Sequence, residues 1–99
     1  MFGSSSSLVF TDIKLDGLNY RAWAFSVKTT LRGYNLASHL TDDPPDPKKV
    51  DVEAVKAWQK EDDRVLIGLV LSVDVSLRMS FEYHTSAEQT WTYFENRYV

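Results

Sequence analysis

The segment from Asp51 to Ser72 constrains the fold more than any other part of this 99-residue chain. Asp51 is a preferred N-cap residue and Glu53 suits the positive end of a helix dipole, so a helix is predicted to run from there to about Leu71 or Ser72. Its first half is amphipathic, but between residues 65 and 71 apolar side chains point in all directions around the axis. A helix of that kind has to be enclosed by other elements, which indicates a bundle built around it.

One face of this helix carries a carboxylate among apolar residues. On a helical wheel, Trp58, Leu66 and Leu69 share a face, and Asp62 lies near its centre. An unpaired carboxylate there would be costly, so Asp62 must have partners. It is either an acid tuned for chemistry or a buried acceptor that holds another helix. We favour the second interpretation, because no companion catalytic group stands at helical spacing from Asp62.

Residues 15–33 predict a second helix with both ends marked. Asp16-Gly17 favours a turn, Asn19 is a preferred N-cap, and Gly33 suits the C-terminal cap. The helix should therefore begin at residue 20. Its apolar stripe supplies the core positions Tyr20, Trp23, Val27 and Leu31.

The remaining segments are shorter. Residues 41–49, TDDPPDPKK, are predicted to be a loop, because their three prolines exclude both helix and β-ladder. Short helices are predicted at residues 35–40 and from Ser72 or Asp74 to Met79, and residues 85–88 have the pattern of a capping box for a last helix. The apolar stripe of that last helix contains Ala87, Trp91, Phe94 and Tyr98.

Together these patterns predict an all-α fold, a small bundle of four to five helices with an extended N-terminal segment. Residues 1–7 are expected to be a disordered lead, and residues 8–99 a single domain whose residues 8–15 are extended. A chain that is 43% hydrophobic and 13% aromatic can form a small core. We expect Trp23, Trp58 and Trp91 to meet at the junction of the three main helices.

Motifs spread from Leu15 to Tyr98 resemble the N-terminal capsid-like region of the Gag polyprotein of plant copia-type LTR retrotransposons. In order, they are Leu15-Asp16-Gly17-x-Asn19-Tyr20-x-x-Trp23, Leu31-Arg32-Gly33, Leu36-x-x-His39-Leu40, Trp58-x-x-x-Asp62, Leu71-Ser72 and Thr85-x-Ala87-x-x-x-Trp91-x-x-Phe94-x-x-x-Tyr98. The resemblance implies a helical lobe that binds other copies of itself in cytoplasmic virus-like particles. It also implies that the chain is a fragment of a longer Gag, or a host protein derived from one.

Composition excludes several partners and chemistries. The net charge is −3 and the basic residues are scattered among acids, so this segment is not expected to bind RNA directly. In the family that it resembles, RNA is bound by a basic region and a zinc knuckle farther along, and neither is in this sequence. There is no cysteine for a disulfide, a catalytic thiol or a Cys-based zinc site. The start of the sequence lacks the charged and apolar pattern of a signal peptide, and no apolar stretch approaches the ~20 residues that span a bilayer, so an intracellular protein with no membrane contact is expected. The resemblance implies that its location is cytoplasmic.

The histidines, serines and glycines of the sequence do not form a catalytic or metal-binding pattern. His39 and His84 lack a carboxylate or histidine partner at helical spacing, which favours surface or capping roles. The serines have no nucleophile-elbow context, and no glycine-rich loop is available for phosphate. We therefore expect no enzymatic activity, no metal and no cofactor.

The expected function is self-association as a Gag-like capsid domain in virus-like particle assembly. Two regions carry apolar residues beyond those needed for the core: Phe25 on the outer face of the first helix, and Ile67, Gly68 and Leu71 on the long helix. The second region has an alternative, coverage by the short helix or the N-terminal segment. For the whole chain, the alternative is a host-adopted adaptor that keeps the Gag fold and binds a different protein.

Overall fold

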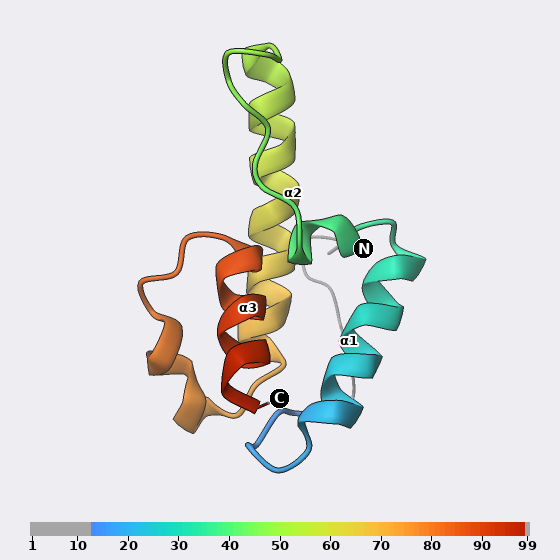
Figure 1. The fold of residues 1–99 in the computed structure, drawn as a ribbon, viewed down its shortest axis with the longest axis vertical. Helices are drawn as coiled ribbons and strands as arrows, with labels where there is room; N and C mark the ends of the chain where they lie inside the picture. Colours follow the sequence, from blue (N-terminus) through green and yellow to red (C-terminus); the bar gives the residue numbers. More distant parts are fainter. Residues whose placement is uncertain (1–12, 99) are drawn as a thin grey trace, which may run out of the picture.

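Five helical elements make up the fold. The computed structural model describes residues 13–98, which form the α-helices α1 (Tyr20–Gly33), α2 (Val52–Leu71) and α3 (Ala87–Tyr98) and the 3-10 helices η1 (Ala37–Leu40) and η2 (Val75–Phe81) (Figure 1). The prediction of an all-α bundle of four to five helices is therefore confirmed. The predicted lead at residues 1–7, and most of the extended segment at 8–15, lie outside the described residues.

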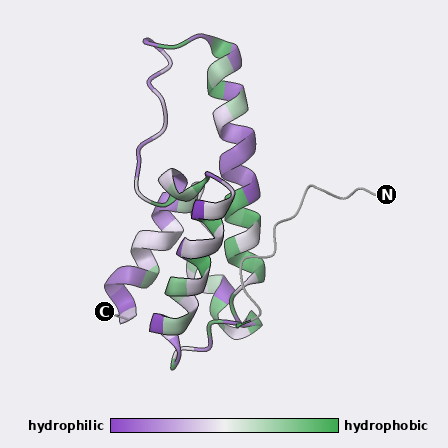
Figure 2. Cartoon of the chain, turned by 90° about the vertical axis from the view of Figure 1, so that its right-hand side faces the viewer, coloured by the Kyte–Doolittle hydropathy of each residue, from purple (hydrophilic) through white to green (hydrophobic). Residues whose placement is uncertain are grey.

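The long helix α2 is the axis around which the other elements are arranged. Its C-terminal half lies among them, whereas its N-terminal half projects beyond the body with the proline-containing loop beside it (Figure 1). Asp51 caps α2 as predicted, because its side chain accepts a hydrogen bond from the backbone N–H of Ala54 at 2.8 Å. Hydrophobic residues gather in the enclosed half of α2, and polar residues dominate its middle (Figure 2).

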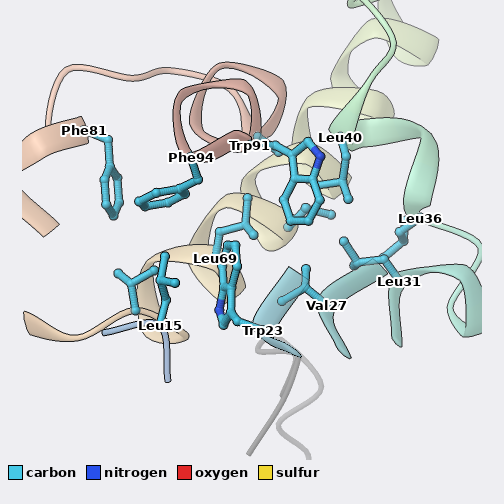
Figure 3. Packing of buried hydrophobic residues seen from close by; sticks show 13 residues of the cluster. Leu15, Trp23, Val27, Leu31, Leu36, Leu40, Leu69, Phe81, Trp91 and Phe94 are labelled. Carbon is cyan, nitrogen blue, oxygen red and sulfur yellow. The ribbon is translucent and has the colours of Figure 1, made fainter. Parts of the chain in front are cut away.

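The core forms where α1, α3 and the C-terminal half of α2 face one another (Figure 3). The Trp23 ring stacks on Trp91 with 5.6 Å between centroids and meets the edge of Phe94 at 5.5 Å. The indole Nε1 of Trp23 donates to the carbonyl oxygen of Ser72 at 3.0 Å, which ties α1 to the end of α2. The buried apolar residues are Leu15, Trp23, Val27, Leu31, Leu36, Leu40, Val65, Leu69, Val73, Phe81, Ala87, Trp91 and Phe94.

Four residues predicted for the core, Tyr20, Trp58, Leu66 and Tyr98, are only partly buried. Tyr20 and Tyr98 stack on each other at 5.7 Å and pack against the buried cluster. Trp58 instead stacks on His39 at 4.9 Å, away from the other two tryptophans. The predicted junction of three tryptophans is therefore wrong for Trp58, because this ring packs on η1 instead of joining Trp23 and Trp91.

Helix α1 begins at Tyr20 as predicted, but it continues through Gly33 and neither end has the predicted cap. The Asn19 side chain makes no capping hydrogen bond to the helix, and its Oδ1 accepts the backbone N–H of Asp16 at 3.1 Å instead. Asn35, with a φ of 63°, is the residue that takes the left-handed conformation after α1. Gly33, which was predicted to end the helix in that role, is its last helical residue.

The capping box of α3 lies one residue later than predicted. The Ser86 hydroxyl accepts the backbone N–H of Gln89 at 3.2 Å, and Gln89 Oε1 accepts the backbone N–H of Thr85 at 2.7 Å. Before α3, the side chain of Asp74 caps η2, which extends to Phe81. The described end of the N-terminal segment is extended as predicted, since Leu15 pairs with Val73 in an isolated parallel bridge.

Candidate functional site

Asp62 joins three helices through one buried carboxylate. Its Oδ1 lies 2.8 Å from Nδ1 of His39 in η1, and its Oδ2 accepts the backbone N–H of Ala87 at 3.2 Å. Ala87 is the first residue of α3, so this N–H is among the donors that a helix start leaves without an internal partner. A negative charge at that position also suits the helix dipole. Asp62 thus holds α3 and η1 against α2.

His39 was predicted to have a surface or capping role, and that prediction is wrong. The residue is buried, with its ring between Asp62 and Trp58. The contact between His39 and Asp62 joins residues 23 positions apart in the sequence, and helical spacing cannot predict a contact at that separation. Both oxygens of the carboxylate accept donors from neighbouring elements, which is the arrangement of a structural joint. Within residues 13–98, no three His, Asp or Glu side chains are placed to hold a metal ion.

The structure separates the residues that were predicted for self-association. Phe25 is exposed on α1, and Ile67 and Leu71 are exposed on α2. Gly68 is buried, so its assignment to an association surface is corrected. In the apolar half of α2, positions 67 and 71 face outward, whereas position 68 turns toward the interior.

Aromatic side chains between α1 and α3 hold the two helices apart and leave a groove along their seam. The groove consists of two adjoining hollows of about 390 Å³ and 330 Å³. Both are lined by Lys28 and Arg32 of α1 and by Trp91 and Glu95 of α3, and Phe25 lines the larger one. We call this surface the α1–α3 groove.

The α1–α3 groove has an aromatic centre and a positively charged side. Arg21, Lys28 and Arg32 are exposed on α1, which has no acidic residue. Phe25 stands four residues after Arg21 and three before Lys28, so these side chains are neighbours on the helix surface. A binding face with apolar and acidic groups would match this surface. The net charge of −3 gave no sign of it, because acids elsewhere in the chain mask the positive helix.

On α3, Glu95 contributes a negative charge to the groove. Burial, and secondarily the charge of Glu95, raises the pKa of Tyr20 above its ordinary value. Tyr20 and Glu95 both line the larger hollow. Asp42, which follows η1, lines the smaller hollow. The groove therefore has three cations, all on α1, against the two carboxylates of Glu95 and Asp42.

The described helices are each too short or too polar to cross a membrane. Comparison of the chain with family models, curated proteins and solved structures gave no match.

Proposed function

We propose that this chain is a capsid-like structural domain that acts by binding copies of itself, like the copia-type Gag proteins that its motifs resemble. The observation that carries the proposal is Phe25, an aromatic side chain that is 72% exposed at the edge of the α1–α3 groove. In such a role the domain would be a building block of a cytoplasmic particle, and RNA would be bound by other regions of a longer Gag.

An exposed aromatic side chain can stabilise an assembly when a partner covers it. Covering a phenylalanine side chain stabilises an assembly by about 1.5–3 kcal/mol. The fold of the monomer gains little of this from Phe25, since most of its surface is in solvent. Aromatic residues and arginine are enriched in protein interfaces, and Phe25 has Arg21 and Arg32 beside it in the same hollow.

The positions of the motif residues also support the proposal. Trp23, Trp91 and Phe94 pack together in the core, and Asp62 links α2 to α3. The residues that carry the resemblance thus have structural roles in one helical bundle. A domain whose function is assembly needs such a rigid scaffold beneath its association surface.

The experiment is sedimentation velocity with light scattering over a wide concentration range. The wild-type mass should grow with concentration, and Phe25→Glu should shift the distribution toward monomer while helicity and melting stay nearly unchanged. Tyr83→Glu is the matched control, because Tyr83 is an 86% exposed aromatic residue that does not line the groove. A wild-type protein that stays monomeric at millimolar concentration would contradict self-association and favour the adaptor alternative.

A further inference from the structure

A second surface, formed by the projecting part of the molecule, has the opposite charge to α1. We call residues 43–53, most of the loop after η1 and the first residues of α2, the arm (Figure 1). Every residue of the arm is exposed except Pro45, which is half-buried. Four acids against two lysines give the arm a net charge of −2. The acids are Asp43, Asp46, Asp51 and Glu53.

The arm holds its shape through local hydrogen bonds. The Asp46 side chain accepts the backbone N–H of Lys48 at 2.9 Å, and its carbonyl oxygen accepts that of Lys49 at 2.9 Å. Asp51 caps α2, and the three prolines fix their own φ angles. Binding therefore requires little ordering of the arm, which lowers the entropic cost of association.

Two apolar side chains lie near the tip of the arm. Val50 is 39% exposed and Val52 is 64% exposed. The tip stands away from the body of its own molecule (Figure 1), so its own groove is out of reach. An exposed apolar pair on a projecting acidic segment is the complement of Phe25 within a basic helix face.

We infer that the arm of one copy binds the α1–α3 groove of a second copy. The two valines would cover Phe25, and the arm carboxylates would face the three cations of α1. This inference rests on the proposed function, because it specifies the contact through which self-association occurs. The contact is heterologous: each copy offers an arm and a groove, so binding can continue from copy to copy.

Charge reversal on each surface tests the inference. The groove variant is Lys28→Glu with Arg32→Glu, and the arm variant is Asp43→Lys with Glu53→Lys. Each should weaken association by about tenfold or more, because two attractive charge pairs become repulsive. Combining the four substitutions in one chain should restore association to about the wild-type level, since the reversed charges again attract. Dissociation constants would come from sedimentation, with circular dichroism to show that each variant is folded.

A charge-matched control separates local contact from net charge. Asp63→Lys with Glu82→Lys changes the net charge as the arm variant does, at exposed positions outside the arm and the groove. It should leave the dissociation constant within about twofold of wild type. An arm variant that behaves like this control, or a combined variant that stays as weak as the single-surface ones, overturns the arm contact. Wild type that never associates overturns the proposed function itself.

Discussion

Removal of the Asp62 carboxylate is the sharpest test of how this fold is held together. Asp62→Ala would leave two buried donors without an acceptor, Nδ1 of His39 and the backbone N–H of Ala87. Each buried donor left without an acceptor costs about 1–3 kcal/mol, so the loss of both contacts should cost about 2–6 kcal/mol. A domain of this size has a total stability of roughly 5–15 kcal/mol, so the variant should be close to unfolding.

Two further variants provide comparisons for the loss of stability expected from Asp62→Ala. Asp63→Ala removes an exposed carboxylate that accepts only the side chain of Gln59, four residues earlier, and should cost less than about 0.5 kcal/mol. Asp62→Asn should lower stability by an amount between those for Asp63→Ala and Asp62→Ala. Its amide oxygen can still accept the backbone N–H of Ala87, while its NH₂ group can donate to His39 in the tautomer whose Nδ1 is an acceptor.

The assay is urea denaturation followed by circular dichroism and tryptophan fluorescence, with thermal melting as a second measurement. Each kcal/mol shifts the melting temperature of such a domain by about 4–8 °C, so the difference between the alanine variants should be large. Equal destabilisation by Asp62→Ala and Asp63→Ala would refute the assignment of Asp62 as the joint between helices. Normal stability of Asp62→Ala would show that His39 and Ala87 find other acceptors.

Three other predictions concern single positions. Trp23→Ala should cost about 3–5 kcal/mol in urea denaturation, whereas Trp58→Ala should cost about 1–2 kcal/mol, because the Trp58 ring is only partly buried. Gly17→Ala should lower stability by about 1–2 kcal/mol, because φ there is +96°. Gly33→Ala should raise stability by about 0.5–1 kcal/mol, because a Cβ atom at this helical position would meet nothing within 4 Å beyond its own helix and chain neighbours. A hydrogen bond from the Ser76 side chain lowers the pKa of Asp74. The stabilisation is therefore present above the ordinary carboxyl pKa and lost as pH falls through the lowered one, so the stability difference between wild type and Asp74→Ala should shrink in acid.

Local signals in the sequence predicted the helices well, but they could not predict contacts between residues that are far apart in the sequence. Periodicity, which neighbouring residues determine, indicated where α1 and α2 lie, and the Asp51 cap marked the start of α2, whereas the caps predicted for α1 are not made. The same periodicity indicated that Asp62 is buried and needs partners. It could not identify His39 or Ala87, because these lie on other helices at sequence separations of 23 and 25 residues.

Trp58 shows a different limit of periodicity. A helical wheel indicates the face on which a side chain lies, but not whether another element reaches that level of the helix. At about 1.5 Å per residue, the 20 residues of α2 extend about 30 Å, against about 21 Å for the 14 residues of α1 and about 18 Å for the 12 of α3. Part of α2 must therefore remain uncovered, and Trp58 lies near the limit of coverage.

This mismatch in helix length links the fold to the association that we propose. The uncovered end of α2 keeps the arm clear of its own body, so its valines and carboxylates remain available to another molecule (Figure 1). On the other side of the core, the aromatic rings between α1 and α3 keep these helices apart, which leaves the α1–α3 groove open along a positively charged helix. Each surface is thus a consequence of how the core is filled. A shorter α2, or smaller side chains at Trp23 and Trp91, would remove the proposed contact together with the packing that creates it.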